Sequence, residues 1–378
     1  MHMHWTILIE IEDIIFDLFW DWHARRLRHA ESAQALELER RARRQDDRAL
    51  LPGLKEPLWL AYRAFMPRCR TLIHIDMNMV SPITKPLRYD GLMIRRIALV
   101  LVAALIVFLL AIYTQSPRTD RAWDDEFSRV TTAYAEGDSI ILTNVRDWTY
   151  SGPFAVAEKQ WIDTLAVNPD DITRTWFLLD QFSTHEGVGH TFLSFERKDG
   201  GAVSFSIEAR REEGETYSVL GGVLNAYELQ YLWGTERDFV PLRTVYLEHS
   251  VRMYPLTLSK EESQALFRAL TEETNQLAQK PRFYHTLLAN CTNMLAKIVN
   301  EHYPGRLPYD IAWNLTGYAD RYLMEQGLIE RTGPDEETRR LADLTPHRED
   351  IQAAASMSPE AFSAFLRSLL VHVQSDGV

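Results

Sequence analysis

The stretch that decides the fold is GHTFLSFERKDGGAVSFSIEAR, residues 189–210. Two runs of alternating apolar and polar residues flank an Asp-Gly dipeptide at 199–200, which is a typical β-hairpin turn. Apolar side chains can be buried together only if they share one face of the sheet. That condition pairs Phe195 with Val203 and Leu193 with Phe205, and so predicts the register of the hairpin.

The same register places His190 opposite Glu208 on the other face of the hairpin. Side chains at opposed positions have Cβ atoms within about 5.5 Å, so the carboxylate could hold the imidazole and fix its tautomer. The alternative interpretation is an ion pair at the rim of the sheet with no catalytic role.

Outward from the hairpin, the pattern predicts an α+β fold with a central antiparallel sheet and packed helices. Further strands are predicted at residues 139–145, 174–179, 239–247 and 251–256. A capping box beginning at Ser259 opens a helix that runs to residue 278. A second helical stretch carries Cys291 and ends at residue 302, and a short helix is predicted over 318–326. A last helix is predicted over 359–371, with Ser358 as its N-cap.

Cys291 is the candidate nucleophile. Apolar residues recur around it at helical spacing, so it faces inward, which is equally consistent with a buried, inert thiol. If a helix begins at Asn290, a good N-cap residue, the thiol lies at the positive end of the helix dipole and its pKa falls. A thiol, an imidazole and an orienting carboxylate together are suited to acyl transfer through a thioester.

The composition narrows the function classes. The chain has 378 residues, of which 46% are hydrophobic, and a net charge of −12, which disfavours nucleic acid as a partner. Two cysteines exclude a disulfide scaffold. No phosphate-binding or dinucleotide-binding loop is present, so no cofactor is expected. The segment HEGVGH, 185–190, resembles a zinc motif, but its spacing and its two glycines argue against the required helix, and no metal is expected.

Residues 97–113, IALVLVAALIVFLLAIY, carry no charge and predict one transmembrane helix. The alternatives are a buried core helix and a signal peptide, although no small-residue cleavage site follows. Arg95 and Arg96 precede the segment, which places the N-terminus in the cytoplasm and the main domain on the periplasmic or extracellular side of the inner membrane.

These features divide the chain into four parts: residues 1–92, a signal anchor over 95–115, an extracytoplasmic domain over 120–330, and a C-terminal helical tail over 331–378. Residues 1–92 are either a cytoplasmic extension or lie before the true start at Met93. Residues 33–49 within them could form a solvated helix. Cys69 would lie across the membrane from Cys291, which would leave Cys291 unpaired.

Several blocks resemble the Lnb-type N-terminal periplasmic domain family: GHTFLSF (189–195), SFSIEARREEGETYS (204–218), YELQYLWGTERDFVPLRT (227–244), FYHTLLANCTNML (283–295) and LPYDIAWNLTGYADRYLMEQGLI (307–329). The block around Cys291 is also similar to the permuted, NlpC-like papain-fold enzymes. The resemblance implies that fold, with Cys291 as nucleophile, His190 as base and Glu208 as the third polar residue. Lnb-type proteins carry further membrane spans after this domain, which this chain does not show, so the resemblance implies the thiol chemistry and not the lipoprotein reaction of the family.

The predicted function is therefore that of a membrane-anchored, cysteine-dependent acyl hydrolase or acyltransferase. The substrate would be a membrane lipid, a lipoprotein or a peptidoglycan fragment, with Asn290, Arg210 and Tyr284 as substrate-binding candidates. The alternative is an envelope binding or assembly module without turnover. The charged residues in the matching blocks could bind substrate or form salt bridges at strand ends; these are Arg210, Arg211, Glu236, Arg237, Asp238 and Arg243.

Overall fold

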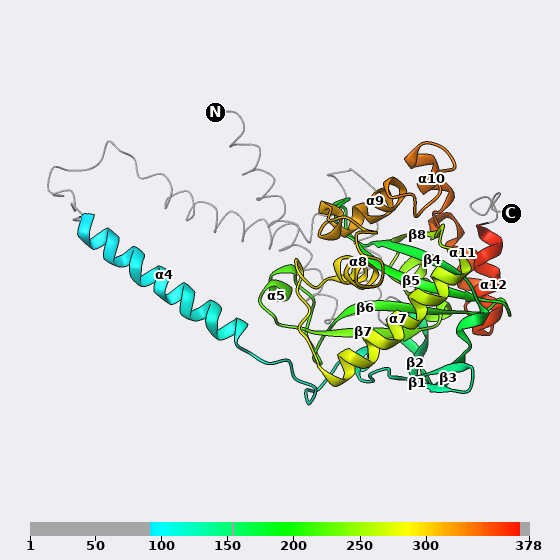
Figure 1. The fold of residues 1–378 in the computed structure, drawn as a ribbon, viewed down its shortest axis with the longest axis horizontal. Helices are drawn as coiled ribbons and strands as arrows, with labels where there is room; N and C mark the ends of the chain where they lie inside the picture. Colours follow the sequence, from blue (N-terminus) through cyan, green and yellow to red (C-terminus); the bar gives the residue numbers. More distant parts are fainter. Residues whose placement is uncertain (1–90, 153–154, 371–378) are drawn as a thin grey trace, which may run out of the picture. The chain divides into compact units, whose positions relative to one another are not determined.

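Eight strands form one sheet within residues 91–152 and 155–370, the part of the chain that the computed structural model describes. Their order is β1-β2-β7-β6-β5-β4-β8, and β3 pairs with β2 (Figure 1). The strands are β1 (Ala133–Glu136), β2 (Ser139–Gly152), β3 (Ala155–Val167), β4 (Ile172–Gln181), β5 (His190–Arg197), β6 (Ala202–Arg210), β7 (Glu228–Gly234) and β8 (Ser250–Pro255).

The helices are α4 (Gly91–Tyr113), α5 (Val219–Val223), α6 (Glu236–Pro241), α7 (Lys260–Gln279), α8 (Cys291–His302), α9 (Ala319–Glu325), α10 (Asp335–Leu341), α11 (Arg348–Ala354) and α12 (Pro359–Leu369). Short 3-10 turns are η1 (Asp125–Phe127), η2 (Pro169–Asp171), η4 (Ile311–Trp313), η5 (Thr316–Tyr318) and η6 (Thr345–His347). The segment η3 (Leu242–Tyr246) is a π-helix.

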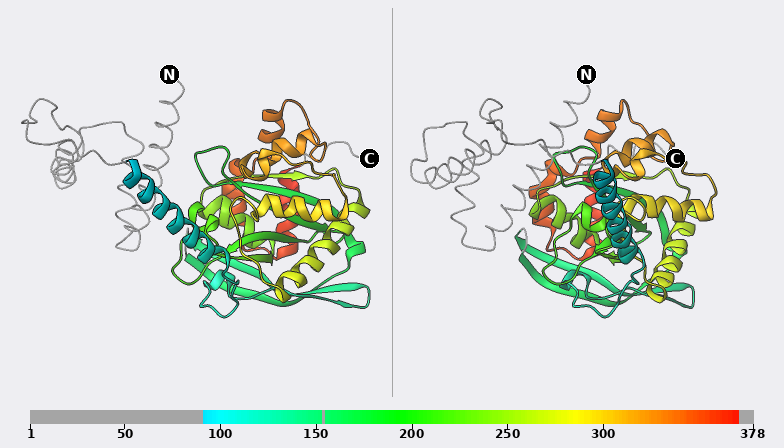
Figure 2. Two further views of the ribbon diagram at one scale, coloured as in Figure 1. Left: turned by 60° about the vertical axis from the view of Figure 1, so that its left-hand side comes forward. Right: turned by 90° about the vertical axis from the view of Figure 1, so that its left-hand side faces the viewer.

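Apolar side chains on both faces of the sheet make two separate cores. Leu193 and Phe205 face helices α7 and α8, in one buried cluster with Phe267. On the opposite face, Phe192 packs in a second cluster with residues of α6, α11 and α12, including Phe362. Figure 2 shows these helices on the two sides of the sheet. A strand buried on both faces needs apolar residues at successive positions, which explains the run from 191 to 195.

The predicted hairpin register is confirmed. Phe195 pairs with Val203 and Leu193 with Phe205, and the ladder continues to Phe192 and Ser206. Burial of the odd-numbered side chains under α7 and α8 selects this register, because a slip of one residue would move them to the other face. The capping box at Ser259 is also present at the start of α7.

Two predictions about the elements are wrong. The sheet is mixed rather than antiparallel, because β2 meets β7 in a parallel bridge between Arg146 and Gly234. Residues 239–247 are not a strand: α6 and η3 occupy them, and the side chain of Thr235 caps α6 by accepting a hydrogen bond from the Asp238 N–H. Their β-branched, apolar run reflects burial in the second core, which a helix also provides.

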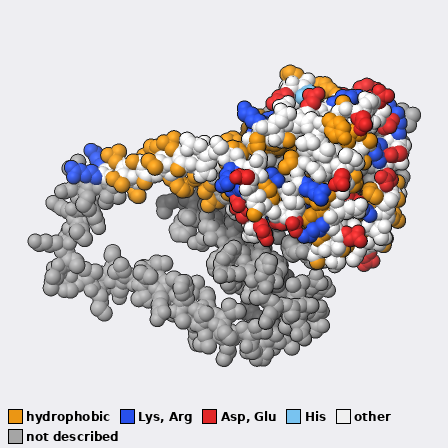
Figure 3. Space-filling view, turned by 90° about the horizontal axis from the view of Figure 1, so that it is seen from below, with side chains coloured by type: hydrophobic (Ala, Val, Ile, Leu, Met, Phe, Trp, Pro, Cys, Tyr) orange, Lys and Arg blue, Asp and Glu red, His pale blue; other side chains and the backbone are white. Residues whose placement is uncertain are grey.

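Helix α4 covers the segment predicted to span the membrane. Apolar side chains lie along it (Figure 3), among them Leu99, Val100 and Leu101, each more than 60% exposed. Among residues 91–152 and 155–370, no helix has both the length and the apolar character that crossing a membrane requires. The transmembrane prediction is therefore not supported.

The C-terminal helices belong to the sheet's second face. Phe362 and Leu366 of α12 are fully buried in the second core, and Ser358 caps the helix as predicted. The helix predicted at 33–49, Cys69 and the extension up to residue 90 lie outside the described residues.

Candidate active site

Cys291 is the first residue of α8, as the candidate site requires. Asn290 is the N-cap, with extended backbone, and its side chain accepts a hydrogen bond from the Asn293 N–H at 2.8 Å. The Asn293 side chain in turn accepts from the Asn290 N–H at 2.9 Å, which completes a capping box. The Asn290 amide also donates to the carbonyl oxygens of Thr286 and Trp313, both at 2.9 Å. The helix start is therefore held from both sides.

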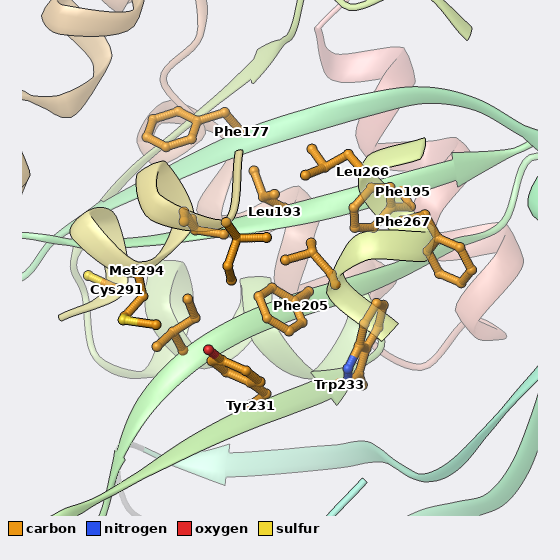
Figure 4. Close-up of a cluster of buried hydrophobic side chains, with 14 of the residues drawn as sticks. Phe177, Leu193, Phe195, Phe205, Tyr231, Trp233, Leu266, Phe267, Cys291 and Met294 are labelled. Carbon is orange, nitrogen blue, oxygen red and sulfur yellow. The ribbon is translucent and has the colours of Figure 1, made fainter. Parts of the chain in front are cut away.

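The thiol lies at the edge of the first core. Cys291 is 4% exposed and is a free cysteine, and Figure 4 shows it beside Met294, at one end of the cluster that contains Leu193 and Phe205. At the N-terminus of a 12-residue helix, the unpaired N–H groups and the helix dipole favour a negative charge on this sulfur.

His190 is the first residue of β5, and its ring is held in one orientation. Its Nε2 atom lies 2.7 Å from the Ser206 hydroxyl oxygen, and that hydroxyl donates to Glu208 Oε1 at 2.7 Å. Nε2 and Glu208 Oε1 are themselves 3.3 Å apart. Because Ser206 donates to the carboxylate, its oxygen accepts from Nε2–H, which leaves Nδ1 for another partner. The ring also stacks on Phe192 at 6.1 Å between centroids.

Cys291 and His190 approach each other around the end of β5. Cys291 belongs to the core on the Leu193 face, whereas His190 projects from the opposite face together with Ser206 and Glu208. His190 is the first residue of β5, and its imidazole interacts there with the thiol as a charge and as a hydrogen-bond partner.

The electrostatics of the pair favour a thiolate and an imidazolium. Burial alone raises the pKa of Cys291, but the charge of His190 and hydrogen bonds from His190 and Thr191 outweigh burial and lower that pKa below 9.0. Burial also opposes the charged form of His190, yet Glu208 and Cys291 together raise its pKa to about 10. Both shifts favour transfer of the thiol proton to the ring.

Glu208 stays ionised because it is surrounded by donors. Burial alone raises its pKa, but His190, Arg243 and the Ser206 hydroxyl lower it well below 4.5. The guanidinium of Arg243 lies 3.3 Å from Glu208 Oε1 and, through Nε, 3.3 Å from Asp180. Asp180 also contacts His249 Nδ1 at 2.8 Å. A continuous polar chain therefore runs from the imidazole to β4 and β8.

The segment that carries Arg243 is the π-helix η3. Such segments occur frequently at functional sites, because the extra residue per turn re-aims a side chain. The guanidinium of Arg243 also lies over the rings of Phe192 and Phe239, 4.9 Å and 5.3 Å from their centroids. These contacts hold its charge beside Glu208.

The predicted substrate-binding residues fall into three different environments. Asn290 is the N-cap of α8. Tyr284 is buried in the first core with Cys291, and burial raises the pKa of its hydroxyl well above 10. Arg210 donates to the Phe127 carbonyl and lies 4.0 Å from the Trp123 ring centroid, so its contacts are with the segment before β1.

The other charged candidates are mostly structural ion pairs. Arg146 and Asp238 form a buried pair at 2.8 Å, and Glu236 pairs with Arg367 at 2.8 Å. Arg211 contacts Glu126, and Arg237 contacts Asp147. Arg243 differs from these residues, because its charge reaches the candidate site.

Sequence reasoning missed Ser206, Thr191 and Asp180. Ser206 could have been found, because it alternates with Glu208 on the strand face that carries His190. Thr191 and Asp180 carry no sequence signal of this kind, since their roles depend on how α8 and β4 pack against β5.

The segment HEGVGH does not form a helix. It makes a turn that leads into β5, and Glu186 pairs with Arg321 and Arg339 instead of facing a metal. Within the described residues, no group of three or more His, Cys, Asp or Glu side chains could hold a metal ion.

Together these elements define an α+β domain in which a cysteine at a helix N-terminus meets a strand-borne histidine held by a carboxylate. Residues 157–316 match the model of the family described as the Lnb N-terminal periplasmic domain. The match confirms the predicted resemblance, includes Cys291, His190 and Glu208, and supports an extracytoplasmic domain. Neither the curated proteins nor the solved structures contained a match to the chain.

Proposed function

We propose that the domain is an extracytoplasmic, cysteine-dependent acyl hydrolase or acyltransferase. The observation that carries this proposal is the hydrogen bond between the Cys291 thiol, at the N-terminus of α8, and the His190 imidazole. Ser206 and Glu208 orient that imidazole. A reactive thiol needs a lowered pKa and a positioned base, and both features meet at this point.

In the proposed reaction, the Cys291 thiolate attacks the carbonyl carbon of an ester or amide and forms a tetrahedral intermediate. Collapse of that intermediate breaks the bond to the alcohol or amine, which leaves with a proton from the His190 imidazolium. The acyl group remains on sulfur as a thioester. Water or an amine then gives its proton to His190 and attacks the thioester, which releases the acyl group and regenerates the thiolate.

The N-terminus of α8 would hold the developing negative charge. A backbone N–H in the first turn cannot bond within the helix, and the helix dipole adds a partial positive charge there. The capping box uses the N–H groups of Asn290 and Asn293, which leaves the Cys291 N–H next to the sulfur as the proposed oxyanion donor.

The proposed substrates are a membrane lipid, a lipoprotein or a peptidoglycan fragment. We further propose that α4 attaches the domain to the cytoplasmic membrane, with the domain on its outer side, because the exposed side chains over 98–110 are apolar. Extraction of membranes with alkaline carbonate tests the attachment: a protein held by apolar burial stays in the pellet, and its release would contradict this part of the proposal.

A non-catalytic envelope-binding module is the second candidate. The observation that favours it is the 4% exposure of Cys291, which also suits a buried, inert thiol. The two candidates differ in whether the folded protein forms a covalent acyl adduct at this residue.

The test is acylation of the full-length protein with 4-nitrophenyl acetate, followed by peptide mass spectrometry. We expect an acetyl group on Cys291 to form faster than on the same thiol in urea-unfolded protein. His190→Gln should slow this reaction by roughly 10²–10⁴-fold, because the general base is lost. The Cys291→Ser variant is the control for other acylated residues. No adduct on Cys291, or one that forms equally fast in His190→Gln, would overturn the proposal.

A further inference from the structure

A cavity of about 260 Å³ lies beside α8, next to the candidate site. Close-packed protein interiors contain few voids larger than a water molecule. Most of the cavity lining is aliphatic or aromatic, with Leu193, Leu295 and Trp313 among its residues. The polar and charged lining residues are Thr191, Thr292, Glu262 and Arg306. A preformed apolar cavity of this kind is typical of a binding site for an apolar group.

The cavity follows one face of α8 away from Cys291. Thr292, Ala296, Val299 and Tyr303 all line it, at the spacing of a single helical stripe. Tyr303, the C-cap of α8, is eleven positions after Thr292, so the stripe is about 16 Å long at the rise of an α-helix. The cavity is therefore elongated, with one end at the first turn of the helix.

Two threonines lie where the cavity approaches the thiol. Thr191 and Thr292 both line the cavity, and their hydroxyl oxygens are 3.0 Å apart. Thr191 also makes a hydrogen bond to Cys291, and the Thr292 hydroxyl lies 3.9 Å from the sulfur. Because the two hydroxyls satisfy each other, they present little unpaired polarity to an apolar chain that passes between the sulfur and the cavity.

We propose that this cavity binds the aliphatic chain of the acyl group that Cys291 accepts, so that the substrate is a medium-chain acyl ester or amide. This inference rests on the proposed function and deepens it. An apolar cavity of 150 Å³ holds one benzene molecule, so 260 Å³ accommodates roughly ten carbon atoms. Arg306, which follows α8, lines the cavity at the end away from Cys291, and a longer chain would meet its charge there.

The test measures binding without turnover. Full-length Cys291→Ala protein is titrated with hexanoate, octanoate, decanoate, dodecanoate and hexadecanoate, below their micellar concentrations, by calorimetry. We expect affinity to rise roughly four-fold for each added methylene, as burial of apolar surface predicts, up to about ten carbons, and then to stop rising. An affinity that is independent of chain length, or that rises unbroken to sixteen carbons, would overturn the inference.

A cavity-filling variant gives a second, independent readout. Ala296→Phe places a ring in the cavity from the face of α8, whereas the control Ala364→Phe adds the same ring to an exposed position on α12. Ala296→Phe should weaken decanoate binding at least ten-fold and leave hexanoate less affected, and Ala364→Phe should change neither. If Ala296→Phe does not fold, the chain-length series with the Cys291→Ala protein still decides.

The outcomes separate the two proposals. Chain-length-dependent binding without acylation of Cys291 would support the cavity and overturn the proposed reaction. Acylation of Cys291 by acetyl and decanoyl esters at equal rates, without decanoate binding, would support the reaction and overturn the cavity.

Discussion

At the scale of single residues, the candidate site is a chain of alternating charges that begins at a sulfur. Cys291, His190, Glu208 and Arg243 follow one another. The charge of each later member stabilises the charged form of the member before it, at Cys291, His190 and Glu208. The chain ends at Asp180, which is itself paired with His249. Removal of one member therefore changes the ionisation of the next, which makes the arrangement measurable by titration.

The first prediction concerns the thiol. Because His190 lowers the pKa of Cys291, the rate of alkylation by iodoacetamide in the folded protein should keep its plateau below pH 9 and decline only at lower pH. In His190→Gln the midpoint should move upward, since burial then acts without the compensating charge. Peptide-resolved mass spectrometry follows Cys291 separately from Cys69. Equal midpoints in the two proteins would show that the imidazole does not act on the sulfur.

The second prediction concerns Glu208→Gln and the pH dependence of stability. The depressed pKa of Glu208 contributes stability above pH 4.5 that is lost as the pH falls. The raised pKa of His190 contributes stability that is complete below pH 6.5 and is lost as the pH rises through about 10. The difference in unfolding free energy between wild type and Glu208→Gln should therefore be greatest between pH 4.5 and 6.5.

We expect a maximum difference of about 3 kcal/mol, because the substitution removes one anionic partner from each of two buried cations, His190 and Arg243. Urea denaturation across pH measures it. The surface variant Glu337→Gln, which also loses a contact with an arginine, serves as control and should show little change at any pH. A difference for Glu208→Gln that does not vary with pH would contradict the assigned ion pair.

The hairpin residues of the site were predictable, and the rest depended on tertiary packing. Alternation along 190–195 and 203–208 leaves one register that buries the apolar faces, and that register opposes His190 and Glu208. Arg243 was indistinguishable from the other arginines of its block. Arg243 lies beside Glu208 because its segment is a π-helix, which no periodicity in the sequence predicts.

At the scale of elements, the start of α8 determines where the sulfur lies. The third prediction is that Asn290→Ala lowers the unfolding free energy by about 2 kcal/mol, since it removes a cap together with two bonds to loop carbonyls. The midpoint of Cys291 alkylation should also rise, because the first turn of the helix is no longer held.

The matched control is Ser358→Ala, which removes the cap of α12 on the other face of the sheet. It should cost about 1 kcal/mol and leave the Cys291 midpoint unchanged. If both variants shift the midpoint equally, the effect is one of global stability, and the local role of Asn290 is contradicted.

Element types were predictable where a cap or a turn marked them. Ser259 and Ser358 marked two helix starts correctly, and the Asp-Gly turn marked the hairpin. The run 239–247 misled because a buried helix needs the same apolar residues as a buried strand. The strand β7 was missed although each of its residues is buried, since its polar members Glu228 and Gln230 interrupt the apolar pattern.

At the scale of the whole domain, the two faces of the sheet have different tasks. One face carries α8 and the cavity, and α6, α11 and α12 pack against the other face. Phe192 connects them, since it is buried in the second core and stacks on His190. The packing of α12 therefore affects the orientation of the imidazole through Phe192.

The fourth prediction concerns the attachment of α12 to α6 through the buried pair of Arg367 and Glu236, whose carboxylate is fully buried. Arg367→Ala should lower the unfolding free energy by about 3 kcal/mol, because it leaves Glu236 charged without its main partner. Arg340→Ala, at an exposed pair with Glu337, should change stability little. Replacing both members, Arg367→Met with Glu236→Gln, should recover part of the loss, since no buried charge remains unpaired. If the double variant is as unstable as Arg367→Ala, the loss comes from the contact of the guanidinium with the Trp176 ring, and the argument from the unpaired charge of Glu236 is wrong.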